Sequence, residues 1–403
     1  MRFFSGDRIV VTALILLIAS LLILSAPAEA AEPADPEYEM ELLEEFLRAD
    51  ELEEDMYSQQ LLDQIDIDQL MEVRDEFSRE LGEIENIERT GDHLYEINYT
   101  KGRLDMQFAV FDDRVTSIYF LSATETGAEL EDIVEDFAEF SGDVSLLVKI
   151  DGEEIISHEP EKELAVGSTF KLAVLSALEG EIEAGERSWS DTLTLSEQDR
   201  SLPTGELHNW PAGFSFTLES LAGRMISRSD NTATDMLINE LGREKIEEIS
   251  PHNRPFFTTR EAFILKDPGR AEILERYRGA DAEKKYDILQ ELEDEELPSA
   301  DIFEEVRALD VEWFFSTREL AELMEEVGRL DLMNINPGPA DPENWERIAF
   351  KGGSEPGVVN YTHLLKDENE GEYFISATWN DEEELPEGRF ERFYSSLLEE
   401  LSR

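Results

Sequence analysis

A lysine lies inside an apolar segment, and this feature most restricts how the chain can fold. Lys171 is followed by Leu172-Ala173-Val174-Leu175, a run too apolar for an ordinary surface helix. Burial lowers the pKa of a lysine because the ammonium group loses its hydration. A shift from ~10.4 to about 7 costs on the order of 4–5 kcal/mol, which a purely structural lysine has no reason to carry. The sequence therefore predicts a functional amine at the start of a buried helix.

Ser168 precedes this lysine by three residues. Residues at i and i+3 share one face of a helix, so the amine can reach the hydroxyl and take its proton. The S-x-x-K pattern alone is weak, since it also occurs by chance on solvated helices. Its apolar context favours an activated nucleophile.

Two further triplets follow in order, Ser229-Asp230-Asn231 after a helix-like segment and Lys351-Gly352-Gly353 after the strand-like Ile348-Ala349-Phe350. Each triplet alone is compatible with a simple turn. The ordered set of three is the one found in class A β-lactamases and penicillin-binding proteins. Over roughly residues 124–403 the chain thus resembles the class A β-lactamase-like serine hydrolases.

The secondary-structure pattern of this segment agrees with the resemblance. Helical periodicity is expected at Glu129–Phe140 and Phe390–Leu401, and strands at Val144–Ile150, Glu153–Ile156, Gly357–Leu365 and Tyr373–Trp379. Strands at both ends with helices between them predict an α+β fold, in which a helical layer packs on one antiparallel sheet. The resemblance implies the same architecture.

The resemblance also implies a role for each motif residue. Ser168 would be the acylated nucleophile, Lys171 its general base, and Ser229 the relay that protonates the leaving group. The expected substrate-binding residues are Asn231, Lys351, Gly353 and Ser354, with Lys351 supplying positive charge for a substrate carboxylate and for lowering the pKa of Lys171. Asp230 is expected to brace its loop. The oxyanion hole should combine the Ser168 N–H with a second N–H near Ser354 or Glu355.

Two positions depart from the family pattern. Gly352 stands where class A enzymes carry a Thr or Ser hydroxyl, unless Ser354 replaces that contact. The deacylating glutamate has one candidate, Glu261, but Thr258-x-x-Glu261 is also a capping box, and Ser316-x-x-Glu319 repeats the pattern. We favour the cap. Slow deacylation, ester hydrolysis and simple penicillin binding therefore stay open.

No other constellation competes with these motifs. The histidines show no metal-ligand spacing and no Ser-His-Asp order, so we expect neither a metal nor a cofactor; they are His93, His158, His208, His252 and His363. The loop 201–205 is expected at one edge of the cleft. Trp210 is expected to pack on its own domain rather than stack on substrate.

The first thirty residues have the pattern of a secretory signal. A short segment with Arg2 and Arg8 precedes the apolar stretch Ile9–Leu24, and Ala28-Glu29-Ala30 resembles a cleavage site. The alternative is an uncleaved anchor over Ile9–Ala26. We expect a secreted, periplasmic or cell-surface protein. The chain has no cysteine, so its core alone must hold the fold.

The chain is strongly acidic, with 96 Asp and Glu against 35 Lys and Arg and a net charge of -61. Self-repulsion at this charge destabilises a compact state in dilute buffer, whereas molar salt reduces the Debye length to ~3 Å. Because the acids interleave with apolar positions, we expect a protein from a salt-loving organism. Nucleic acid and anionic membranes are disfavoured as partners.

Residues 36–123 form a second predicted domain. Helical periodicity covers Tyr38–Arg48 and Ile67–Leu81, and alternating runs cover His93–Thr100, Arg103–Phe111 and Val115–Leu121. This pattern predicts a three-stranded antiparallel meander packed on helices, with Leu104, Met106, Phe108 and Val110 facing them. It resembles the small steroid-isomerase-like domain of two-domain serine hydrolases, and we expect a scaffold or substrate-presenting role.

These observations together predict an exported serine hydrolase that acts through an acyl-enzyme on Ser168. The expected substrate is a β-lactam, an ester or a peptidoglycan-like molecule. The alternative is a penicillin-recognising or peptidoglycan-binding module with slow or no turnover. No stable membrane partner is expected unless the signal stays uncleaved.

Overall fold

A computed structural model describes residues 34–49, 52–62, 65–125, 130–303 and 305–403. The predicted signal, residues 1–30, and its alternative as an anchor lie outside these ranges. No helix within them is long and apolar enough to span a bilayer. Contacts divide the chain into two compact units, Met1–Asp136 with Pro386–Arg403, and Phe137–Leu385. The sequence-based division at 123/124 assigned the C-terminal helix to the second domain, and those limits stay a prediction.

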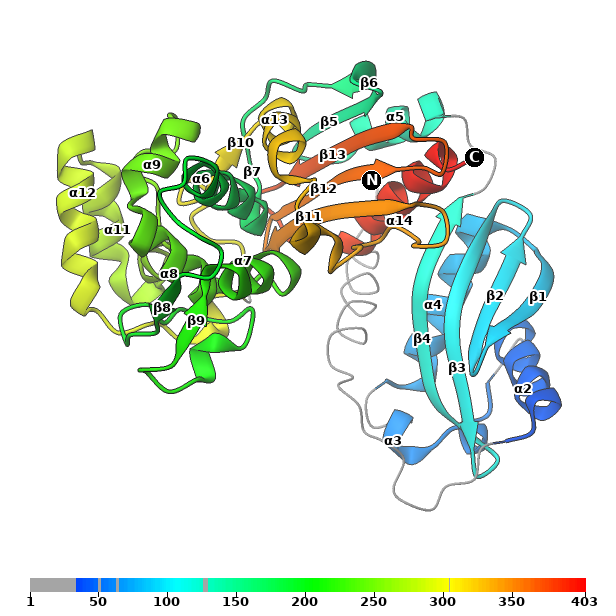
Figure 1. The fold of residues 1–403 in the computed structure, drawn as a ribbon. Helices are drawn as coiled ribbons and strands as arrows, with labels where there is room; N and C mark the ends of the chain where they lie inside the picture. The colour runs from blue at the N-terminus through cyan, green and yellow to red at the C-terminus, as the bar shows by residue number, and fades with distance from the viewer. Residues whose placement is uncertain (1–33, 50–51, 63–64, 126–129, 304) are drawn as a thin grey trace, which may run out of the picture. The chain divides into compact units, whose positions relative to one another are not determined.

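The first unit joins helices to a four-stranded antiparallel sheet of order β1-β2-β3-β4 (Figure 1). The helices are α2 (Pro36–Arg48), α3 (Gln59–Leu62), α4 (Ile67–Leu81) and α14 (Glu387–Leu401), and the strands are β1 (Ile84–Gly91), β2 (Leu94–Tyr99), β3 (Gly102–Phe111) and β4 (Arg114–Glu125). The sequence predicted three strands, and the sheet has a fourth, β1. β1 is an edge strand with mostly exposed side chains, so it lacks the apolar alternation that identifies the other three.

The apolar face of β3 forms the core of this unit. Leu104, Met106, Phe108 and Val110 are all buried, as predicted, and they share one cluster with side chains of α2 and α4. Phe108 packs against Phe46 of α2 with ring centroids 5.9 Å apart. Their alternation along the strand places all four on one face of the sheet.

The second unit contains a five-stranded antiparallel sheet of order β11-β12-β13-β5-β6 (Figure 1). Its strands are β5 (Asp143–Ile150), β6 (Glu153–His158), β11 (Arg347–Glu355), β12 (Val358–Lys366) and β13 (Glu372–Asn380). The four strands expected from the sequence and the strand that carries Lys351 are therefore confirmed. β11 forms one edge of the sheet, which leaves its outer side available to the segment that carries Ser168.

Helices cover this sheet and extend beside it (Figure 1). They are α6 (Lys171–Glu183), α7 (Leu218–Ser227), α8 (Asn231–Leu241), α9 (Arg243–Ile249), α10 (Thr259–Lys266), α11 (Ala271–Arg278), α12 (Ala282–Glu291) and α13 (Thr317–Val327), and α5 (Leu130–Ala138) precedes β5. Two short pairs of strands, β7 (Leu164–Ala165) with β10 (Phe314–Phe315) and β8 (Thr192–Thr194) with β9 (Ser215–Thr217), complete the unit. The expected α+β architecture, a helical layer on an antiparallel sheet, is observed.

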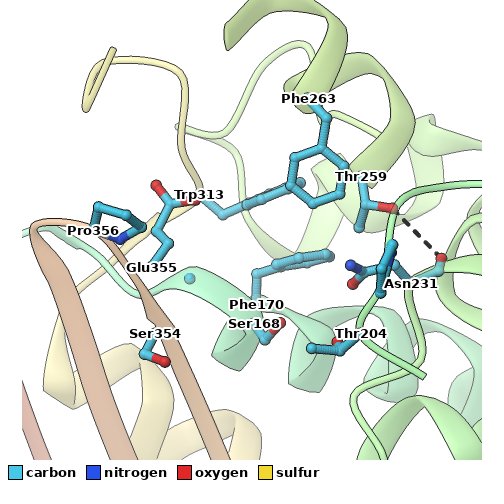
Figure 2. Close-up of a pocket in the computed structure, with 12 residues that line it drawn as sticks. Ser168, Phe170, Thr204, Asn231, Thr259, Phe263, Trp313, Ser354, Glu355 and Pro356 are labelled. Atoms are coloured by element: carbon cyan, nitrogen blue, oxygen red, sulfur yellow. Dashed lines mark hydrogen bonds between the residues drawn. The ribbon is translucent and has the colours of Figure 1, made fainter. Parts of the chain in front are cut away.

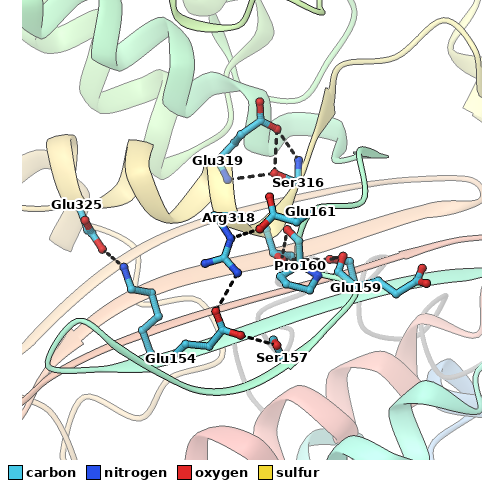
Figure 3. A network of polar contacts seen from close by, with 12 residues as sticks. Glu154, Ser157, Glu159, Pro160, Glu161, Ser316, Arg318, Glu319 and Glu325 are labelled. Carbon is cyan, nitrogen blue, oxygen red and sulfur yellow. Dashed lines mark hydrogen bonds and ion pairs between the residues drawn. The ribbon is translucent and has the colours of Figure 1, made fainter.

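The first turn of α13 is fastened to the strands by polar contacts (Figure 3). Ser316 and Glu319 form the predicted capping box. Arg318 donates to Glu154 of β6 at 2.8 Å and also pairs with Glu161. These contacts hold the helix across β5, β12 and β13, where it supports α6 from the sheet side.

We expect Phe108→Ala to destabilise the first unit by about 3–5 kcal/mol, because it removes a fully buried ring and leaves a cavity. Urea unfolding at molar salt measures this free energy. Leu121→Ala on β4 is the control, since Leu121 is 56% exposed and its truncation should change stability by about 0.5 kcal/mol at most. Equal losses in the two variants would contradict the assigned core.

Candidate active site

Ser168 lies in a short 3-10 turn, Gly167–Phe170, that leads directly into α6. Lys171 is the first residue of the helix, so its side chain lies over the turn that holds the serine. Its Nζ is 3.0 Å from Ser168 Oγ. The predicted pairing of hydroxyl and amine is therefore present.

The Lys171 amine is completely buried and surrounded by oxygen atoms. Its Nζ lies 2.9 Å from Ser229 Oγ, 2.7 Å from the Ser229 carbonyl oxygen and 2.7 Å from Asn231 Oδ1. Burial lowers the pKa of Lys171 well below its usual value, and the neighbouring Lys351 lowers it further, against opposing effects of Asp235 and Asp230. A lowered pKa favours the free amine, which can accept the Ser168 proton.

Ser229 and Lys351 continue the chain of polar groups. Lys351 of β11 is buried, and its Nζ donates to Ser229 Oγ at 3.2 Å. Burial lowers the pKa of Lys351 to about 7. Ser229 has a φ of 52°, a left-handed conformation uncommon for a residue with a side chain. The Ser229 hydroxyl thus lies between two buried amines, where it can pass a proton.

Asp230 and Asn231 have different tasks at the start of α8. Asp230 caps the helix by accepting from the Ala233 N–H at 2.9 Å, and it also accepts from the N–H groups of Glu206 and Leu207. This carboxylate therefore braces two loops, as expected. Asn231 accepts from Lys171 through Oδ1 and donates from Nδ2 to the Leu202 carbonyl at 3.1 Å.

Gly353 allows β11 to approach the Ser168 turn closely. A Cβ atom at Gly353 would lie 2.3 Å from the Val166 carbonyl oxygen and 2.4 Å from Ser168 N. A Cβ at Gly167 would lie 3.2 Å from Ser354 N. The backbone nitrogens of Ser168 and Ser354 therefore belong to two segments in direct contact, which is the arrangement an oxyanion hole needs.

A cavity of about 180 Å³ opens at Ser168 (Figure 2). Ser354 and Glu355 lie on one side of it, at the end of β11, and Asn231 and Thr259 lie on the other. The remaining lining is largely apolar and comes from Gly167, Phe170, Pro203, Thr204, Phe263, Trp313 and Pro356. Phe170 and Trp313 stack with centroids 3.8 Å apart. This wall suits an apolar acyl group.

A side chain at Gly352 would meet two aromatic rings. A Cβ there would lie 2.8 Å from Cζ of Phe350 and 3.0 Å from Cδ1 of Tyr361. The two aromatic rings pack edge to face with centroids 5.7 Å apart. Ser354 lines the cavity and is the remaining hydroxyl of this strand segment.

Glu261 is used by the helix cap and by an arginine. Its carboxylate accepts from the Thr258 N–H at 2.8 Å, the Thr258 hydroxyl accepts from the Glu261 N–H, and Arg243 donates to both carboxylate oxygens. The predicted capping box is thus confirmed. Glu261 is not among the residues that line the cavity.

Thr259 lines the cavity and is bound from behind by the buried Asp235. Asp235 is buried and accepts from Thr259 N and Arg260 N, and also from the Thr259 hydroxyl at 2.9 Å. Burial raises the pKa of Asp235 to about 7, although these hydrogen bonds oppose the shift. One feature of the sequence pointed to Asp235, its position one helical turn after Asn231. Neither residue was predicted.

A second missed feature is an ion cluster beside the cavity. Lys266 at the end of α10 pairs with Glu312 and with Glu355. Burial opposes protonation of Lys266, but the two carboxylates raise its pKa above the usual value. The three residues of this cluster are far apart in the sequence and form no local pattern. The one sequence signal for the cluster was a lysine in an apolar segment, Phe263-Ile264-Leu265-Lys266.

The remaining predicted features lie away from the cavity. Trp210 packs edge to face on Phe214 and Phe216, consistent with a role within its own domain. His363 is buried, burial lowers its pKa to about 4, and its Nε2 lies 3.0 Å from the Pro337 carbonyl oxygen. Among the described residues no group of three His, Cys, Asp or Glu side chains could hold a metal ion.

In its fold the second unit is similar to the β-lactamase family, and it pairs Ser168 with a buried lysine. The sequence model of the Beta-lactamase enzyme family matches residues 127–254. This match confirms the predicted resemblance for the segment that holds Ser168, Lys171 and the Ser229 triplet. The steroid-isomerase-like first domain stays a prediction.

Comparison with solved structures gives neighbours of low identity. PBP-A is 16% identical with a TM-score of 0.48, covering 68% of this chain and 94% of its own. A β-lactamase from Sphaerobacter thermophilus is 19% identical with a TM-score of 0.48, over 68% and 94% of the two chains. A β-lactamase from Chitinophaga pinensis is 14% identical with a TM-score of 0.48, over 68% and 97%. No curated protein matches the sequence.

We expect Lys171→Arg to reduce the rate of Ser168 acylation about 10²-fold or more, because guanidinium keeps the charge but cannot accept a proton near neutral pH. Stopped-flow kinetics with a chromogenic ester measures the rate, and thermal melting verifies folding. Lys284→Arg on the surface is the control. A near-normal rate would mean that Lys171 acts only as an electrostatic brace.

We expect Glu261→Gln to leave the lifetime of the acyl-enzyme almost unchanged, because the amide oxygen can still accept from the Thr258 N–H. Its thermal stability should fall, since Arg243 loses its ion pair. Time-resolved intact-mass spectrometry measures the lifetime. Accumulation of adduct for hours in this variant would identify Glu261 as the deacylating base.

Proposed function

We propose that this protein is an exported serine hydrolase that forms an acyl-enzyme on Ser168 and hydrolyses β-lactams or esters. The observation that carries the proposal is the buried Lys171 amine, which lies within 3.0 Å of Ser168 Oγ, Ser229 Oγ and Asn231 Oδ1. The family match over residues 127–254 supports the same reaction class.

Acylation would begin with proton transfer from Ser168 Oγ to Lys171 Nζ, while the oxygen attacks the substrate carbonyl carbon. The resulting oxyanion would accept hydrogen bonds from Ser168 N–H and Ser354 N–H. The close approach of β11 to the Ser168 turn at Gly353 supports this pairing of donors. The apolar wall at Phe170 and Trp313 would hold the acyl group.

The leaving group would receive its proton through Ser229. Ser229 Oγ lies 2.9 Å from Lys171 Nζ and 3.2 Å from Lys351 Nζ, so the proton taken from Ser168 can return through this hydroxyl. Protonated Lys351 would attract a substrate carboxylate. With a pKa of about 7, this charge is present below neutral pH and is lost above it.

Export and a salt-rich environment belong to the proposal on sequence grounds. The signal-like segment supports export, and the net charge of -61 supports folding at high ionic strength. Activity and binding of this protein are therefore measured at molar salt.

A second candidate function is penicillin or peptidoglycan recognition with slow turnover. It is favoured by the position of Glu261, whose carboxylate is held by Thr258 and Arg243 rather than at the cavity. In that case the acyl-enzyme would form and persist.

The test is intact-mass spectrometry after incubation with penicillin G and, separately, with a chromogenic ester. We expect wild-type protein to gain the acyl mass and Ser168→Ala to gain none while melting normally, because one hydroxyl contributes little to the core. Adduct on the alanine variant, or on Ser229, would overturn the assignment. A wild-type adduct that persists would favour the second candidate.

A further inference from the structure

The ion cluster beside the cavity joins three separate elements. Lys266 is the last residue of α10, Glu355 is the last residue of β11, and Glu312 precedes Trp313. Lys266 and Glu312 are buried, and the Glu355 side chain is only 12% exposed. Lys266 donates to both carboxylates. One ammonium group therefore connects the ends of segments that are distant in the sequence.

Each of these segments supplies part of the cavity. α10 contributes Thr259 and Phe263, the segment after Glu312 contributes Trp313, and β11 contributes Ser354 and Glu355 (Figure 2). Trp313 also accepts, through its carbonyl oxygen, the N–H of Val166 at 3.1 Å, which lies two residues before Ser168. The segments that the ion cluster joins therefore line the cavity at Ser168, and one of them also binds the backbone just before Ser168.

Stability alone does not explain such a cluster. Hydrophobic side chains of similar volume are often as stabilising as a buried ion pair or more so, because desolvation offsets the Coulomb attraction. Here two carboxylates share one cation, and burial together with the neighbouring Glu355 raises the pKa of Glu312 well above its usual value. Of the two contacts that Lys266 makes, the one with Glu355 reaches the end of β11. What this contact adds is a fixed position for the end of β11.

The end of β11 needs such a restraint. β11 is an edge strand that pairs with β12 on one side, and it turns immediately afterwards through Pro356 and Gly357. Its other side meets the Gly167–Phe170 turn without strand pairing. A displacement of the strand end would therefore move Ser354 N relative to Ser168 N.

We propose that the hydrogen bond from Lys266 to Glu355 is a tether that positions the Ser354 N–H for the oxyanion, which makes Glu355 a positioning residue. This inference rests on the proposed acyl-enzyme function. Misplacement of reacting groups by about 1 Å can reduce rates about 10²-fold. Loss of the tether should thus slow acylation more than it weakens ground-state binding.

A carboxylate in the cavity has a competing role as a base for hydrolytic water. Glutamine separates the two roles, because the amide oxygen of Glu355→Gln can still accept from Lys266 but cannot take a proton. Glu355→Ala removes both functions and leaves Lys266 paired with Glu312.

The probes are a chromogenic ester and phenylboronic acid. Boron accepts an electron pair from Ser168 Oγ, the serine proton passes to Lys171, and the negatively charged tetrahedral boronate places one of its hydroxyl oxygens where the oxyanion forms. We expect Glu355→Ala to lower the acylation rate constant and the boronate affinity about 10- to 100-fold, with KM changed less than about threefold, and Glu355→Gln to restore both. Glu181→Ala is the matched control, since it breaks a buried ion pair of α6 distant from the cavity.

The outcomes separate this proposal from the proposed function. If wild-type protein reacts with neither probe, the acyl-enzyme function fails. If it reacts and Glu355→Ala matches it, the tether is refuted. If Glu355→Gln is as impaired as Glu355→Ala, the charge rather than the tether matters, which also refutes it. If Glu355→Ala does not fold, the double variant Lys266→Met and Glu312→Leu tests the tether instead. It removes both buried partners of the cluster and so releases Glu355, and we expect the same losses.

Discussion

The desolvated amine of Lys171 determines how the rest of the active site is built. A fully buried ammonium would be costly, so the site surrounds it with oxygen acceptors and favours its neutral form. Those acceptors come from the Ser168 turn, from Ser229 and from the start of α8. Each segment is fixed in turn by contacts with the backbone. Asp230, for example, accepts hydrogen bonds from three backbone N–H groups. The catalytic geometry and the packing of the helical layer therefore depend on one another.

Cation placement in this chain is unusual given its composition. The sequence has only ten lysines, and three of them, Lys171, Lys266 and Lys351, are buried around one cavity. Elsewhere the basic residues lie mainly in partly exposed ion pairs, which contribute little individually to stability. Three of the ten ammonium groups of this acidic chain are thus buried beside the candidate nucleophile, where each contacts oxygen atoms of other segments.

The sequence predicted the motif residues well because each motif is local. Ser168 and Lys171 share one helical turn, and the cap at Thr258 and Glu261 spans four residues, so spacing alone indicated both contacts. Strands with alternating apolar residues were also found, whereas β1 was missed because its side chains are mostly exposed. Asp235 with Thr259, and Lys266 with its two glutamates, were missed because tertiary packing creates those contacts. The roles of the site residues, the domain limits and the signal stay predictions.

The packing of Phe350 against Tyr361 also restricts the routes by which this site can change. Adding a side chain at Gly352 requires the rings to move, and those rings belong to β11, which carries Lys351, and to its neighbour β12. A substitution at Gly352 would therefore act on the packing of both strands, whereas a substitution at Pro203 or Thr204 would alter the cavity lining from a loop outside these strands.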